Sequence, residues 1–100
     1  MKLVKNYRDT KQKVYVFHSD SGHGWLAVKR KELEDLNILD KISSCSYQSE
    51  TGKTVYLEED CDGSLFVTTY EKKYNTDLLY RGSYQERSFV RNLPLFEKNV

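Results

Sequence analysis

The sequence lacks long apolar runs, and it contains a single proline. Its longest apolar stretches, such as residues 14–17 and 25–28, are far shorter than the roughly 20 residues that a membrane helix needs. Residues 1–5 are not followed by the apolar segment of a signal peptide. These absences predict a soluble, cytoplasmic protein with no membrane partner. With so little proline and many aromatic residues, the chain is expected to fold rather than stay disordered.

An excess of charge of one sign is also missing, since 16 basic and 15 acidic residues leave a net charge of +1. Such a chain has no overall field to attract nucleic acid or to imitate its backbone, which excludes a general nucleic-acid binder. The two cysteines, Cys45 and Cys61, form no CxxC pair. We expect free thiols in a reducing compartment, with both side chains half-buried in ordinary packing.

The 100 residues are enough for one hydrophobic core and therefore for one domain, residues 1–100, with mobile ends at 1–12 and 97–100. β-branched and aromatic runs predict one hairpin from residues 14–18 and 25–29, and a second from 42–47 and 54–58 around a turn at 49–52. Apolar residues at helical spacing predict helices at 31–39 and 63–74.

The later part of the chain carries weaker signals. Residues 78–80 are short and apolar enough for a further strand, 82–87 have the composition of a loop, and 88–92 are expected to dock on the body of the domain. Together these elements predict an α+β fold in which two helices pack on one face of a small antiparallel sheet of four to five strands.

The densest polar group lies in the first hairpin loop, where His18, Asp20 and His23 share one short segment with two glycines. Two imidazoles and a carboxylate are ligands that zinc, manganese or iron accept, but the spacing matches no established zinc motif. The same residues are explained by a glycine-bearing turn in which Asp20 bonds nearby backbone amides. A contact with a ligand or partner is the third interpretation.

A second candidate is the acidic run Glu58, Glu59, Asp60 and Asp62 between a predicted strand and a predicted helix. Clustered carboxylates bind divalent cations or act as general bases. The simpler interpretation is that Asp60 or Asp62 caps the helix N-terminus. If the hairpin loop meets this strand end in space, His18, His23, Glu59 and Asp62 converge on one cleft.

Two further residues join the expected binding surface. Trp25 directly follows a glycine, and we expect its indole to be buried while its N–H reaches a polar partner. Arg91 is one of several basic residues with aromatic neighbours, a combination common at interfaces, although simple solvation also explains such residues. The predicted binding surface therefore comprises His18, Asp20, His23, Trp25, Glu58, Glu59, Asp62 and Arg91. No catalytic residue, bound metal or cofactor is assigned, because no catalytic motif is present; residues 43–46, for example, lack the glycines of a nucleophile elbow.

Three blocks of the chain resemble a family of uncharacterised proteins of similar length from bacteriophages, plasmids and bacterial genomes. The blocks are HSDSGHGWLAV at 18–28, ISSCSYQ at 42–48 and VYLEEDCD at 55–62. The resemblance implies a small accessory protein of a phage or mobile element, a class rich in inhibitors of host defence and modulators of host enzymes.

We therefore expect a non-enzymatic protein that binds a host or phage protein, with a small ligand or nucleotide as another partner to consider. The alternative is a small metal-dependent or nucleotide-handling enzyme that uses the His/Asp loop and the acidic strand end. The sequence does not specify an oligomeric state.

Overall fold

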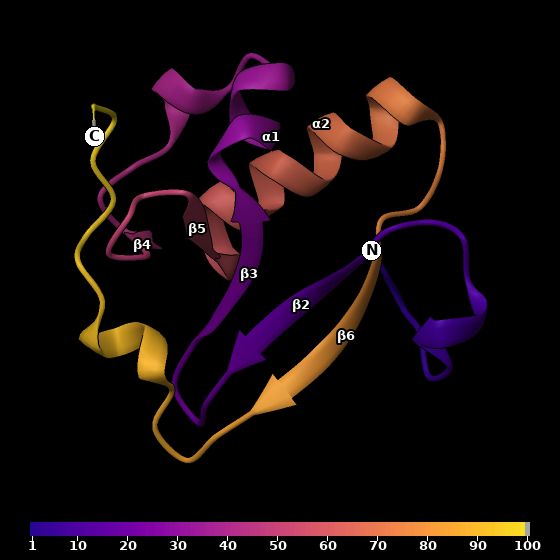
Figure 1. The fold of residues 1–100 in the computed structure, drawn as a ribbon, viewed down its shortest axis with the longest axis horizontal. Helices are drawn as coiled ribbons and strands as arrows, with labels where there is room; N and C mark the ends of the chain where they lie inside the picture. Colours follow the sequence, from indigo (N-terminus) through magenta and orange to yellow (C-terminus); the bar gives the residue numbers. More distant parts are fainter. Residues whose placement is uncertain (100) are drawn as a thin grey trace.

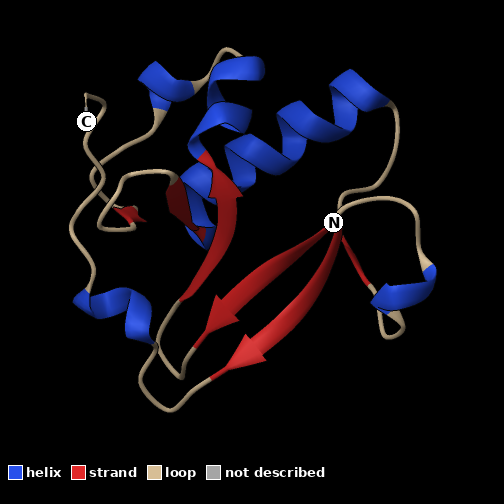
Figure 2. Cartoon of the chain, viewed as in Figure 1, coloured by secondary structure: helices blue, strands red, loops and turns tan. Residues whose placement is uncertain are grey.

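The fold is a six-stranded sheet with two α-helices beside it (Figures 1 and 2). The structure is a computed structural model that describes residues 1–99. The strands are β1 (Lys2–Leu3), β2 (Val14–Ser19), β3 (Gly24–Lys29), β4 (Tyr47–Gln48), β5 (Thr54–Glu58) and β6 (Leu79–Tyr84). The α-helices are α1 (Arg30–Asp35) and α2 (Ser64–Tyr74), with single helical turns at Tyr7–Asp9, Leu39–Lys41, Glu59–Gly63 and Phe89–Asn92. The predicted α+β class is confirmed.

The sheet is mixed, so the prediction of an antiparallel sheet of four to five strands was wrong in detail. Its strand order is β1-β6-β2-β3-β5-β4, and β6 runs parallel to both β1 and β2. The reason is the helical connection through α2, which carries the chain from β5 across the sheet and returns it in the same direction. The two predicted hairpins are present, since β2 pairs antiparallel with β3, and β4 pairs antiparallel with β5. The predicted strand at 42–47 is reduced to Tyr47–Gln48, because the preceding serines bond to Asp62 instead of to a neighbouring strand.

One face of the sheet packs against the helices. Alternate residues of β3 and β5 point to that face, where Leu26 and Leu57 meet Leu33 of α1 and Phe66 of α2 in one buried cluster. Tyr15 of β2 joins this cluster and packs edge-on against the ring of Phe66, with 5.7 Å between the ring centroids. The period-two pattern of the strands thus builds the core and leaves the other face free for different contacts.

The C-terminal segment packs on the rest of the domain, as predicted for residues 88–92. Ser88 and Val90, in and beside the turn Phe89–Asn92, are almost fully buried. Further along, Phe96 enters the main core, and the guanidinium of Arg30 lies over its ring at 5.0 Å. The Arg30 side chain also donates hydrogen bonds to the carbonyl oxygens of Glu97 and Lys98, which fixes the tail beside β4.

Several element boundaries differ from the prediction. The first helix ends early because Asn37 adopts a left-handed conformation with φ of 59°. The second helix begins at Ser64, one residue from the predicted start. The predicted loop at 82–87 is wrong in its first half, since Gly82–Tyr84 continue strand β6. The turn at 49–52 is present, and Gly52 supplies the positive φ of 75° that it requires.

The cysteines, the ends of the described chain and the helix lengths bear on three other expectations. Cys45 and Cys61 are free thiols, but both are exposed rather than half-buried. At the ends of the chain, Lys2–Leu3 pair with β6, while Val100 lies outside the described residues; the mobility of these ends stays a prediction. None of the helices in the described part of the chain is long and apolar enough to cross a membrane.

Candidate functional site

A cleft of 430 Å³ lies where the first hairpin loop, the end of β5 and the C-terminal segment meet. Its lining residues come from four separate parts of the chain: His23, Trp25, Cys45, Tyr47, Glu58, Asp60 and Arg91. The antiparallel pairing of β3 with β5 places Trp25 directly opposite Glu58. The sheet register therefore brings the hairpin loop and the acidic strand end together. Of the four residues expected to converge there, His18, His23, Glu59 and Asp62, only His23 lines the cleft.

Asp20 joins the hairpin loop to the C-terminal segment. Its buried carboxylate accepts two hydrogen bonds from Arg91, from Nε to Oδ2 at 2.6 Å and from Nη2 to Oδ1 at 2.9 Å. The backbone N–H of Ser88 donates to Oδ2, and those of Gly22 and His23 donate to Oδ1, each at 3.0 Å. Hydrogen bonds from Arg91 and then from Ser88 hold the pKa of Asp20 well below its usual range.

This pair positions a cation over an aromatic ring. The Arg91 guanidinium, held by Asp20, lies 5.2 Å from the centre of the Trp25 ring. The Trp25 ring is also flanked by Tyr47, at 6.1 Å, and by His23, at 6.1 Å. Trp25 is buried as predicted, but its Nε1 hydrogen has no acceptor in the part of the chain that the structure describes, so the expected polar partner is not found there.

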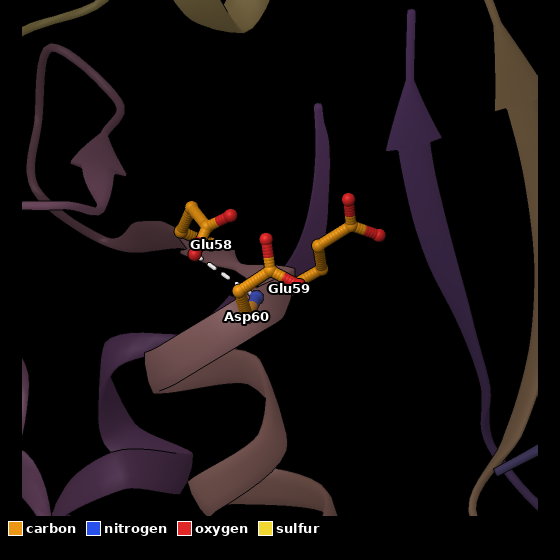
Figure 3. A group of neighbouring side chains, drawn as sticks. All are labelled: Glu58, Glu59 and Asp60. Atoms are coloured by element: carbon orange, nitrogen blue, oxygen red, sulfur yellow. Dashed lines mark hydrogen bonds between the residues drawn. The ribbon is translucent and has the colours of Figure 1, made fainter. Parts of the chain in front are cut away.

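Glu58 and Asp60 line the opposite side of the cleft, and Glu59 lies next to them. Oxygen atoms of Glu58, Glu59 and Asp60 lie within 4.8 Å of one another (Figure 3). The Glu58 carboxylate accepts a hydrogen bond from the backbone N–H of Asp60 at 2.9 Å, and its other oxygen lies 3.8 Å from Nδ1 of His23. Glu58 is mostly buried, whereas Glu59 and Asp60 are exposed. His23 therefore lies beside Glu58, which belongs to a group of three carboxylates.

Asp62 has a different role, although it belongs to the same acidic run. Its buried carboxylate accepts hydrogen bonds from the backbone N–H of Ser43, at 3.1 Å, and from the hydroxyls of Ser43 and Ser46, at 2.9 and 2.5 Å. The Ser46 oxygen in turn accepts from the backbone N–H of Glu58. Asp62 thus fixes the segment that carries Cys45 and Tyr47, and it does not line the cleft.

The expected helix cap is not formed by the predicted residues. Helix α2 has Gly63 at its N-cap without a side-chain hydrogen bond. Glu58 instead accepts from the N–H of Asp60 at the start of the preceding turn. The capping interpretation of Asp60 and Asp62 was therefore wrong, because the extra turn at Glu59–Gly63 moves both residues away from the helix start.

His18, Asp20 and His23 do not converge on one metal position. The ring of His18 packs against the rings of Phe89 and Tyr56, with 5.0 Å and 5.7 Å between the ring centroids. Burial, with the positive charge of Arg81, lowers the pKa of His18. Asp20 is hydrogen-bonded to Arg91, and of these three residues only His23 lines the cleft. Within residues 1–99, Glu58, Glu59 and Asp60 are the cluster whose geometry suits a cation.

The structure brings His23, Trp25, Glu58 and Arg91 together at the cleft, with Asp20 bonded to Arg91. The other predicted residues, His18, Glu59 and Asp62, do not line the cleft. Glu59 lines a neighbouring pocket of 250 Å³ beside Phe17 and Leu26. The sequence analysis did not place Cys45 and Tyr47 at the binding surface, because residues 42–48 indicated only a strand rich in hydroxyl side chains. Partial burial of its sulfur raises the pKa of Cys61 to about 11, which keeps that thiol protonated at neutral pH.

Comparison of the chain with protein-family models, with curated proteins and with solved structures gives no match.

The depressed pKa of Asp20 predicts acid sensitivity. Asp20 is charged in the folded state down to lower pH than in the unfolded chain, so its stabilising effect is present above the unfolded pKa, about 4, and is lost as the pH falls through the folded value. We expect Asp20→Asn to lower the melting temperature at pH 7. The difference from wild type should shrink progressively as the pH falls below about 4. A difference that is the same at pH 7 and pH 2 would contradict this account of Asp20.

The buried contacts of Asp62 predict a large effect on stability. Asp62→Ala leaves the donors of Ser43 and Ser46 without their acceptor, and we expect it to lower the free energy of unfolding by about 3 kcal/mol. The matched control is Asp60→Ala, because Asp60 is an exposed carboxylate in the same turn. It should change the same quantity by less than about 0.5 kcal/mol. Urea denaturation of the three proteins measures both values, and equal losses would refute the assigned role.

Proposed function

We propose that this chain is a non-enzymatic binding protein that recognises a host or phage protein through the cleft of His23, Trp25, Tyr47, Glu58 and Arg91. The observation that carries the proposal is the buried Asp20 carboxylate holding Arg91 over Trp25. Five hydrogen-bond donations to one carboxylate fix the loop and the C-terminal segment in a single arrangement. A rigid, polar surface of this kind loses little conformational entropy when a partner binds.

The charges around the cleft favour a basic group on the partner. Arg91 is already paired with Asp20, whereas Glu59 and Asp60 are exposed beside Glu58. The half-buried ring of Tyr47, which packs against the buried Trp25, supplies the apolar wall against which a lysine or arginine stem would pack. The expected contact is therefore an arginine or lysine side chain of the partner, with its charge at the acidic rim. The resemblance to proteins of mobile elements makes a component of a host defence system, or a host enzyme, the partner to test first.

Substitutions at the rim should weaken binding without unfolding the protein. Wild-type protein and the variants His23→Ala and Asp60→Ala are used as baits in lysates of phage-infected or plasmid-bearing bacteria, and captured proteins are quantified by mass spectrometry. We expect proteins captured by the wild type to fall about tenfold or more with both variants, since loss of a central interface contact typically costs more than 1 kcal/mol. Melting temperatures should stay near the wild-type value, because both side chains are exposed.

Asp9→Ala is the matched control, since Asp9 is an exposed carboxylate in the N-terminal turn rather than at the cleft. It should capture the same proteins as wild type. Equal capture by all four proteins would exclude the cleft as the binding site, and losses that follow the melting temperature would reassign its residues to stability.

A small metal-dependent or nucleotide-handling enzyme is the second candidate, favoured by the grouped oxygens of Glu58, Glu59 and Asp60. Such a cluster suits a hard divalent cation. If this function holds, Mn²⁺ titrated by calorimetry into tag-free protein should bind with one-to-one stoichiometry, and Glu59→Gln should weaken binding about tenfold or more. Asp9→Asn is again the control. Absence of heat at millimolar Mn²⁺ would remove this candidate.

A further inference from the structure

A pocket with an excess of positive charge lies at the end of the sheet where β3 passes into α1. It has a volume of 530 Å³ and lies between the start of α1 and the turn that joins β4 to β5. The charged residues that line it are Lys29, Arg30, Lys31, Lys53 and Glu34. In a chain with a net charge of +1, this basic pocket therefore holds a local excess of three positive charges.

The sheet register brings the basic residues together from two parts of the chain. Lys29, the last residue of β3, lies opposite Thr54, the first residue of β5. The backbone N–H of Arg30 then donates to the carbonyl of Lys53 at 2.8 Å. In the turn before β5, Gly52 supplies the positive φ, and its N–H donates within the turn at 2.8 Å. Backbone hydrogen bonds therefore hold both sides of the basic pocket in place.

Arg30 is a fixed cation that forms no ion pair within residues 1–99. Its half-buried guanidinium donates four hydrogen bonds, and the acceptors are the carbonyl oxygens of Gly52, Glu97 and Lys98 and the side-chain oxygen of Gln48. All four acceptors are uncharged. They replace hydrogen bonds to water without offsetting the positive charge, which has lost part of its hydration. An anion in the pocket would offset that charge.

The lysines around Arg30 add to this unbalanced charge. Lys31 pairs with Asp35 at 3.4 Å, but both side chains are exposed, so water screens the attraction. The ammonium groups of Lys29 and Lys53 form no ion pair in the part of the chain that the structure describes. Because cations that share one pocket repel one another, an anion with several charges would stabilise all of them at once.

We propose that the basic pocket binds a small ligand that carries two or more phosphate groups. Lysine ammonium groups are common partners of phosphate oxygens. A terminal phosphate carries a charge of about −1.5 to −2 at pH 7 and a bridging phosphate about −1, so a diphosphate matches the local excess of three. The hydroxyl-bearing residues Thr51 and Thr54 also line the pocket and supply uncharged donors.

The shape of the charged surface favours a small ligand over a nucleic-acid strand. The volume of 530 Å³ is within the range of small-molecule sites, about 300 to 1,000 Å³. The basic residues gather at one pocket, whereas a groove that binds a single strand carries its positive charge along the path of the backbone. None of the residues of this pocket lines the cleft of His23 and Arg91, so this site does not depend on the function proposed for that cleft.

Calorimetric titration with sodium pyrophosphate, at constant ionic strength and without Mg²⁺, tests the proposal. We expect saturable binding to the wild type with a dissociation constant below about 1 mM. Lys53→Gln should raise this constant about tenfold, because it removes one charge-assisted contact. Lys72→Gln is the matched control, since it makes the same change of net charge at an exposed lysine in the last turn of α2. It should change the constant by less than about twofold.

Glu34→Gln should have an effect of the opposite sign. Glu34 is the acidic residue at the basic pocket, so its neutralisation should lower the dissociation constant for pyrophosphate about threefold. Lys53 and Glu34 are both exposed, and neither substitution should lower the melting temperature without ligand. Opposite changes in affinity at an unchanged melting temperature separate an effect on binding from an effect on folding.

A second probe identifies the source of the phosphate groups. A short single-stranded DNA oligonucleotide offers the same phosphate chemistry along a chain, and we expect it to bind more weakly than pyrophosphate. In amide NMR spectra, pyrophosphate should shift the signals of Gly52 and Lys53 more than that of Lys72. The proposal would be overturned by any of three results: no saturable binding at about 10 mM pyrophosphate, equal effects of Lys53→Gln and Lys72→Gln, or tighter binding of the oligonucleotide.

Discussion

The structure of the cleft depends on one buried carboxylate. A charged aspartate inside a protein is costly unless its oxygens are fully hydrogen-bonded, and Asp20 meets that requirement with donors from two distant parts of the chain. Because the same carboxylate binds the hairpin loop and Arg91, neither segment can shift without exposing an unpaired charge. The cation over Trp25, and with it one wall of the cleft, follows from this constraint.

Asp20 and Asp62 show how two similar carboxylates support one surface from different sides. Asp20 fixes the hairpin loop to the C-terminal segment, while Asp62 fixes the serine-rich segment that carries Tyr47. Both are buried, so both contribute through positioning. The exposed residues His23, Glu59 and Asp60 are left as the groups that can meet another molecule. A fixed interior and an exposed charged rim are the usual components of a specific interface.

The first hairpin, the second helix and the α+β class could be predicted because they depend on local patterns. Short runs of β-branched, aromatic and other apolar residues define β2 and β3, and helical spacing defines α2. The parallel placement of β6 could not be predicted, since it depends on where a crossover helix returns the chain. The extra turn at Glu59–Gly63 likewise has no distinct spacing, and it changed the expected role of Asp62.

At the site, the sequence raised the meeting of the hairpin loop with the acidic strand end, but it did not indicate which acidic residue His23 approaches or which residue binds Asp20. Asp20 and Arg91 are 71 positions apart, and no local pattern links an aspartate in a turn to an arginine in a distant helical turn. Tyr47 was missed for a similar reason, because its place beside Trp25 depends on the Asp62 contacts of the preceding serines. Charge and aromatic character mark such residues as candidates, and only tertiary contacts assign their neighbours.

The long separation between Asp20 and Arg91 also bears on how the protein folds. Contacts between residues far apart in sequence require closure of a large loop, and chains rich in such contacts fold more slowly than chains dominated by local ones. During synthesis the hairpin that carries Asp20 emerges long before Arg91 does. The hairpin can form early, whereas its carboxylate stays solvated until Arg91 has left the ribosome. The wall of the cleft that Arg91 forms over Trp25 is thus completed only after the N-terminal hairpin, the helix α2 and the strand β6 have all been synthesised.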